Sequence, residues 1–159
     1  MEYSLDFSRR LIDAAEFLKE NKSTEAEVAR TIAYLSRLSC EISLKALLEQ
    51  AGFSIRELKN RSHNFEGLLR DICSCELSVN ENSMPLSASR LLAEKVVDDY
   101  FNGTVGALLQ AESEGGSQYP NQIRYGDNVK DYPPLFLIKC ALVVHRWAEE
   151  NIAKIKRKP

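Results

Sequence analysis

The side chains most able to do chemistry cluster in one short polar stretch of the chain. Arg56, Lys59 and Arg61 precede His63, which is one of two histidines in the sequence. Histidine exchanges protons near neutral pH and can act as a general base. Arginine presents a planar fork that binds two phosphate oxygens. A metal-independent ribonuclease needs such a base for the 2′-hydroxyl and such a cation for the scissile phosphate, and we expect neither a metal ion nor a cofactor.

One of these arginines lies a short distance before His63 in the chain. Six residues separate Arg56 from His63, whereas His145 has no arginine at a comparable upstream distance. A structural interpretation stays open beside the catalytic one. In it His63 caps the helix that follows or bonds a neighbouring backbone group, and the cations before it form a solvated connection.

A long amphipathic helix is the element that must position this stretch. Apolar residues recur at helical spacing from Val28 to Ala51, over a surface wide enough to need more than one partner helix. Thr24 with Glu27 forms a capping box at its start. Gly52 stands after the last periodic residue, where a left-handed C-cap is expected.

The remaining pattern predicts an all-α fold. Glu41 and Lys45 lie four residues apart on the long helix, which favours a structural ion pair over a catalytic one. Further helices are predicted over about residues 5–20, 64–75, 87–100 and 133–155, with one short capped turn at Ser54 and Glu57. Residues 112–130 form a loop by composition. We therefore expect a single domain spanning residues 1–159, built as an up-and-down bundle of four or five main helices.

Charge and hydropathy narrow the range of partners. The formal net charge is −2, so no overall basic field favours nucleic acid, although a local basic patch is compatible with it. No apolar run reaches the ~20 residues that span a bilayer, and the N-terminus lacks the apolar region of a signal peptide. We expect a cytoplasmic protein that makes no membrane contact. In that reducing compartment Cys40 and Cys140, inside apolar helices, should be buried thiols.

Several short motifs together resemble the HEPN superfamily. One branch of that superfamily carries an E-x-x-L-K-A-L-L helix, then a glycine, then a G-H-D-L-like segment. The corresponding residues are Glu41, Leu44, Lys45, Ala46, Leu47 and Leu48, then Gly52, then Ser62, His63, Asn64 and Phe65. Arg124 and Tyr125, before the final long helix, are similar to an R-Y-P found at that place, with Gly126 in place of the proline. The likeness spans about residues 24–152.

The resemblance implies a helical bundle that forms a homodimer and acts on nucleotides or RNA, often in toxin–antitoxin or antiviral defence systems. Many members are metal-independent ribonucleases with an R-x(4-6)-H motif, usually at the last major helix. Arg56 and His63 fit this motif by count, but they lie between the second and third predicted helices. Others have lost that motif and act as binding or regulatory modules, and some work with a nucleotidyltransferase or an antitoxin. We expect a nucleotide- or RNA-binding module. A ribonuclease and a purely structural dimerisation domain are the alternatives.

The same layout predicts a composite site at one end of the bundle. It would bring Arg124 and Tyr125 towards His63, which makes a small cationic pocket that binds phosphate and stacks a base. A structural interpretation is that Arg124 and Tyr125 only pin their loop. The candidate catalytic residues are His63 and Arg56, and the candidate phosphate-binding residues are Arg61, Lys59, Arg124 and Tyr125.

Overall fold

The computed structural model describes residues 1–22, 26–78, 84–110 and 134–158. That part of the chain is mostly helical, with 68% of its residues in seven helices. The helices are α1 (Leu5–Lys22), α2 (Ala26–Gln50), α3 (Ile55–Arg61), α4 (Phe65–Cys73), α5 (Arg90–Ala93), α6 (Val105–Gln110) and α8 (Pro134–Asn151). The strands are β1 (Cys75–Leu77), β2 (Leu86–Ser87), β3 (Lys95–Val97), β4 (Asn102–Thr104) and β5 (Ile155–Arg157).

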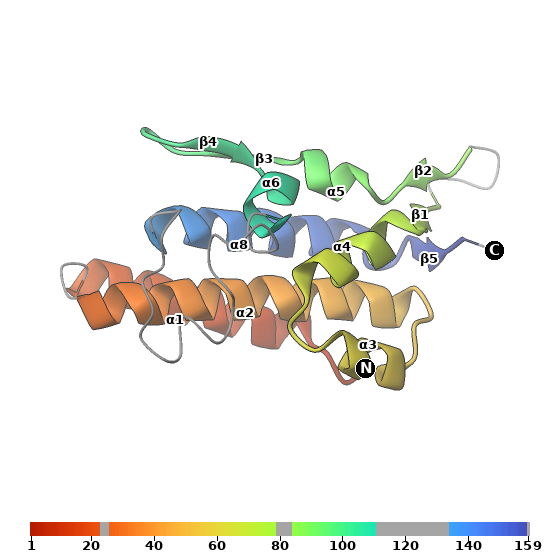
Figure 1. Ribbon diagram of the computed structural model, residues 1–159, viewed down its shortest axis with the longest axis horizontal. Coiled ribbons are helices and arrows are strands. Elements are labelled where there is room, and N and C mark those ends of the chain that lie inside the picture. Colours follow the sequence, from red (N-terminus) through yellow and green to blue (C-terminus); the bar gives the residue numbers. More distant parts are fainter. Residues whose placement is uncertain (23–25, 79–83, 111–133, 159) are drawn as a thin grey trace.

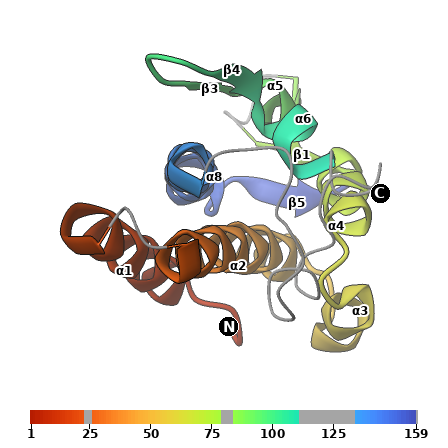
Figure 2. The same cartoon turned by 60° about the vertical axis from the view of Figure 1, so that its left-hand side comes forward.

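Three long helices form the core of the molecule. Helices α1, α2 and α8 run along its long axis, and α2 packs against both of the others (Figure 1). Helix α4 covers another part of α2, and α3 lies on the far side of α2 from α5 (Figure 2). The prediction of a mostly helical protein is therefore confirmed, and so is the long helix that was expected to begin near residue 24.

Two small antiparallel sheets correct the prediction of an all-α fold. One has the strand order β2-β1-β5, and the other is the hairpin β3-β4. The helix predicted over residues 87–100 is wrong beyond the single turn of α5. Val96 is buried while Lys95 and Val97 are exposed, which is the alternation of a strand. Asp98 then accepts backbone N–H groups of Tyr100 and Phe101 and so closes the turn.

The two ends of the α2–α3 connection carry the caps that the sequence predicts. Gly52 has a φ of +101°, a left-handed conformation that glycine adopts without strain. Ser54 Oγ accepts the N–H of Glu57, and the Glu57 carboxylate accepts the N–H of Ser54. Strand β5 holds this connection from the side, because the guanidinium of Arg157 lies 4.2 Å from the ring centroid of Phe53. The capping residue expected at Thr24 lies outside the described residues.

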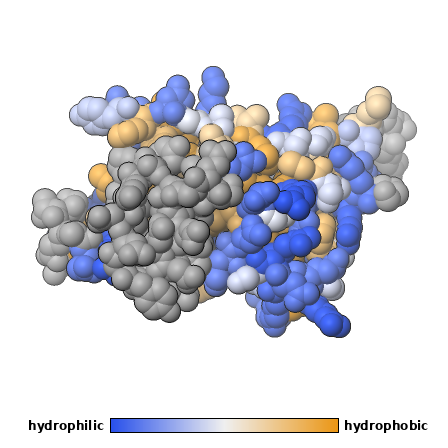
Figure 3. Space-filling view, viewed as in Figure 1, coloured by the Kyte–Doolittle hydropathy of each residue, from blue (hydrophilic) through white to orange (hydrophobic). Residues whose placement is uncertain are grey.

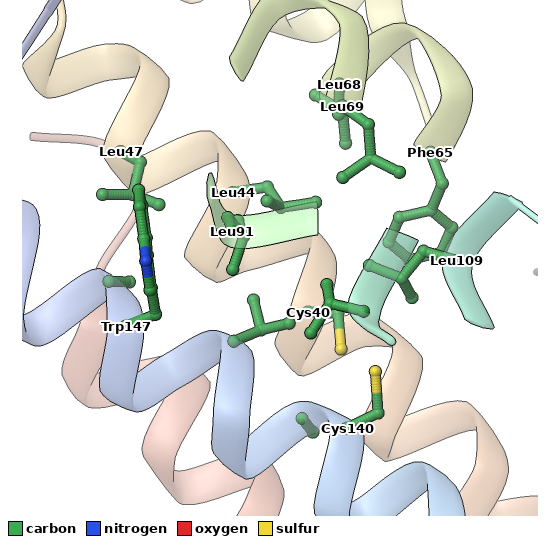
Figure 4. Packing of buried hydrophobic residues seen from close by; sticks show 14 of the residues in the cluster. Cys40, Leu44, Leu47, Phe65, Leu68, Leu69, Leu91, Leu109, Cys140 and Trp147 are labelled. Carbon is green, nitrogen blue, oxygen red and sulfur yellow. The ribbon is translucent and has the colours of Figure 1, made fainter. Parts of the chain in front are cut away.

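The apolar core lies where α2 meets α8 and α4. Leu44 and Leu47 of α2 are fully buried, and Trp147 of α8 packs beside them (Figure 4). The sulfur atoms of Cys40 and Cys140 point toward each other across the same interface (Figure 4). A hydrogen bond with Cys140 and burial raise the pKa of the Cys40 thiol well above its ordinary value. Both cysteines are buried free thiols, as predicted.

The surface over α3 and α4 is largely hydrophilic (Figure 3). None of the helices within the described ranges is long and apolar enough to cross a membrane.

Acid should destabilise the fold through His145. This side chain is 3% exposed on α8, and its Nδ1 atom has no hydrogen-bond partner among the described residues. Burial lowers the pKa of His145 below 6.5, against an opposing effect of Glu149, while Arg9 also lowers it. The unfolded chain therefore takes up a proton at a higher pH than the folded chain does. Stability should fall as the pH drops below about 6.5.

Urea unfolding of wild type and His145→Leu, measured between neutral and mildly acidic pH, checks this expectation. The wild type should lose more stability than the variant over that interval, because leucine does not titrate. Parallel profiles for the two proteins would contradict the expectation.

Candidate functional site

His63 is held by a buried carboxylate. It lies between α3 and α4, and its Nδ1 atom is 2.8 Å from Oε2 of Glu41, which is on α2. The Glu41 side chain is 4% exposed, whereas that of His63 is 36% exposed. The imidazole is therefore anchored on its inner side and still reaches the surface. This contact joins residues 22 positions apart in the chain.

Lys45 completes the buried cluster. Its Nζ atom donates to Oε1 of Glu41 at 2.7 Å and to the backbone carbonyl of Ser62 at 2.7 Å. The same Nζ lies 5.3 Å from the ring centroid of Tyr3. One carboxylate thus binds the lysine with one oxygen and the imidazole with the other. The ion pair between Glu41 and Lys45 that the sequence predicts is confirmed, and it also supports the segment before His63.

Ser62 has an unusual backbone conformation directly before His63. Its φ of 49° with ψ of −121° lies in a region that residues with a Cβ atom rarely adopt. Such a conformation costs on the order of 1–3 kcal/mol and persists only where its surroundings enforce it. Here the Ser62 N–H donates to the Lys59 carbonyl and the Ser62 carbonyl accepts from Lys45. The backbone N–H and the carbonyl of Ser62 are therefore both held by hydrogen bonds. Together they fix the backbone from which the His63 side chain projects.

Asn64, and not His63, caps the helix that follows. The Asn64 side-chain oxygen accepts the N–H of Gly67 at 2.9 Å, at the start of α4. The interpretation of His63 as a helix cap is therefore wrong. Its side chain is directed to Glu41 instead.

The three cations of the α3 segment differ in their surroundings. Arg61 forms a bidentate pair with Asp71 of α4, at 2.6 and 2.9 Å. Lys59 pairs with Glu2 at 2.8 Å. Arg56 is exposed and forms no ion pair with any residue that the structure describes. The charges of Arg61 and Lys59 are therefore partly neutralised by carboxylates. Arg56 is the cation of this segment best placed to bind an external anion.

Arg124 and Tyr125 lie outside the described residues. Their predicted approach to His63 stays a prediction. The site that the structure does describe consists of His63, Glu41 and Lys45. Arg56 is an exposed residue of α3, and within the described part of the chain no hydrogen bond or ion pair joins it to this cluster.

The N-terminal segment and Asp71 are parts of this region that the sequence analysis missed. Glu49 of α2 accepts the backbone N–H groups of Glu2 and Tyr3 and so fixes the chain beside Lys45. Burial and the nearby carboxylate of Glu2 raise the pKa of Tyr3. The acidic residue that neutralises Arg61 is ten positions away and on another helix. Spacing alone gives no signal for either arrangement.

The chemistry of the cluster follows from its geometry. A carboxylate beside Nδ1 orients the ring and favours the tautomer that carries its proton at Nδ1. This is the arrangement of a general base or of a hydrogen-bonding contact to a ligand. Among the described residues, no group of three or more metal-binding side chains is gathered.

Comparison with known proteins yields no relatives, because no family model, no curated protein and no solved structure matches this chain.

Proposed function

We propose that this protein is a HEPN-like, up-and-down helical bundle that binds RNA or a nucleotide at His63. The observation that carries the proposal is the 2.8 Å contact from the half-exposed imidazole to the buried carboxylate of Glu41. Burying an ion pair costs desolvation energy. In this proposal the buried pair of Glu41 and Lys45 is kept because it fixes the half-exposed ring of His63. The resemblance of residues 41–65 to HEPN motifs supplies the ligand class.

The charge distribution supports binding in preference to cleavage. Asp71 and Glu2 partly neutralise Arg61 and Lys59, which leaves Arg56 as the cation of this segment that forms no ion pair with a described residue. One phosphate contact with a histidine hydrogen bond suits recognition of a nucleotide or an RNA end. In this proposal Arg124 supplies a second phosphate contact, and Tyr125 stacks a base.

Binding of a fluorescent single-stranded RNA, measured by anisotropy with chelator present, tests the proposal. We expect saturable binding that His63→Ala weakens at least about tenfold, because a charge-assisted hydrogen bond contributes about 1.5–3 kcal/mol. Arg56→Gln should weaken binding in the same direction. Arg10→Gln removes the same charge from an exposed site on α1 and is the matched control. Equal binding by wild type and His63→Ala would contradict the proposal.

A metal-independent ribonuclease is the second candidate. The specific observation in its favour is that the carboxylate of Glu41 orients the His63 ring through Nδ1, which is how a carboxylate supports a histidine general base. In this candidate Arg56 or Arg61 stabilises the phosphate. Gel analysis of the same RNA incubations separates the two candidates. Cleavage in the presence of chelator that His63→Ala abolishes favours the ribonuclease, and intact RNA in a stable complex favours the binding module.

We also propose that two copies form a homodimer, and that the natural setting is a defence or toxin–antitoxin system with a nucleotidyltransferase or antitoxin partner. Light scattering after size-exclusion chromatography measures the molar mass in solution and so tests the homodimer. A dimer that binds no RNA or nucleotide would instead favour the third candidate, a structural dimerisation domain.

A further inference from the structure

A second cluster of cations lies on another part of the molecule. Arg90 of α5, Lys95 of β3 and Arg146 of α8 line an open hollow of roughly 470 Å³, together with Ala93 and Glu94. Helix α5 lies across the helical core from α3 in both views (Figures 1 and 2). The hollow is therefore separate from the candidate site at His63.

Three cations and one carboxylate, that of Glu94, line this hollow. Within the described ranges, none of Arg90, Lys95 and Arg146 forms an ion pair or a side-chain hydrogen bond. Exposed cations in this chain often have such partners, as Arg9 does with Asp13 and Arg70 with Glu66. Three cations that converge without partners, on a chain of net charge −2, create a local positive field.

The walls of the hollow are fixed by buried neighbours. Arg146 lies between His145 and Trp147, which are both buried in α8. Leu91, next to Arg90, and Val96, next to Lys95, are each 0% exposed. The Glu94 carbonyl also accepts the N–H of Val105. The backbone that carries the three cations is therefore held in place. Because this backbone is already ordered, less conformational entropy of the protein is lost when an anion binds.

We infer that this hollow is a second, oxyanion-binding site that takes a phosphate or diphosphate group. Two guanidinium groups supply forked donors for phosphate oxygens, and the lysine adds a point charge. The Glu94 carboxylate repels an anion, but it can accept a hydrogen bond from the ligand. We therefore expect the ligand to carry a donor, such as a sugar hydroxyl, next to its phosphate. This inference does not depend on RNA binding at His63.

The ligand chemistry has two sources, a free nucleotide or the phosphorylated end of an oligonucleotide. Calorimetric titration with inorganic pyrophosphate at low ionic strength tests the shared chemistry. ADP and a short 5′-phosphorylated RNA, each compared with its unphosphorylated form, distinguish the sources. We expect pyrophosphate to bind. We also expect either ADP or the 5′-phosphorylated RNA to bind more tightly than the same molecule without its phosphate.

Variants place the binding in the hollow. Arg146→Gln and, separately, Arg90→Gln should each raise the Kd for pyrophosphate at least about tenfold. Arg10→Gln, which removes an exposed cation elsewhere, should change it little. Glu94→Gln should lower the Kd because it removes a repulsive carboxylate.

The inference is overturned if pyrophosphate shows no saturable binding to folded wild-type protein. It is also overturned if Arg146→Gln and Arg90→Gln bind it no worse than Arg10→Gln does. Thermal unfolding of each variant in the absence of ligand verifies the fold, and the exposed positions of Arg90 and Arg146 predict little change.

Discussion

Replacement of Glu41 by glutamine is expected to destabilise the protein by about 3–5 kcal/mol, because it leaves the charge of Lys45 buried without a counter-charge. Both side chains are buried, at 4% exposure for Glu41 and 5% for Lys45, so water cannot substitute for the lost carboxylate. The glutamine keeps the shape of the side chain, so the loss reports charge and hydrogen bonding more than packing. Urea unfolding monitored by circular dichroism measures it.

Two further variants isolate the cause of that loss. Lys45→Met added to Glu41→Gln removes the unpaired charge and should recover more than half of the lost stability. Glu66→Gln on α4 makes the same chemical change in an exposed pair with Arg70 and should cost less than about 1 kcal/mol. If Glu41→Gln and Glu66→Gln were equally mild, the buried cluster would not have the energetic role given to it here.

Leu44→Ala should destabilise the protein by about 2–5 kcal/mol, through lost apolar burial and the cavity left behind. Leu44 is 0% exposed and lies on α2, which packs against both α1 and α8 (Figure 4). A cavity at that position removes contacts in the apolar core where α2 meets α8 and α4. The free energy of unfolding from urea titration gives the size of the effect.

Leu135→Ala is the matched control for this substitution. Leu135 also lies in a long helix, α8, but is 40% exposed. The same deletion of side-chain atoms there should cost less than about 1 kcal/mol. If Leu44→Ala lowered the free energy of unfolding no more than Leu135→Ala does, the prediction would be wrong, and the interior would have to close around the missing side-chain atoms.

Helix α2 could be predicted from the sequence because local signals mark its body and its end. The apolar spacing after Val28 and the left-handed position at Gly52 both depend on nearby residues only. The hairpin β3-β4 could not be predicted in the same way. Val96 and Val97 fall at positions that also suit a continuing helix, and only their β-branched side chains and the turn-forming Asp98 favoured strands. Tertiary contact with α8 decides between the two.

The candidate site was predictable in its parts but not in its assembly. The sequence indicates His63 as a chemical residue and the pair of Glu41 and Lys45 as an ion pair, since each prediction depends on local spacing. It gives no reason to expect that the same carboxylate binds both partners, because that contact is made across 22 positions. It likewise could not reveal that Asp71 engages Arg61.

Contact between RNA and His63 is the central claim, and NMR of the two histidine rings during titration with single-stranded RNA measures it most directly. The chain provides its own control, because His145 is 3% exposed and His63 is 36% exposed at the side chain. We expect the ring signals of His63 to move with saturation while those of His145 stay in place. RNA that binds without moving the His63 signals would contradict the account.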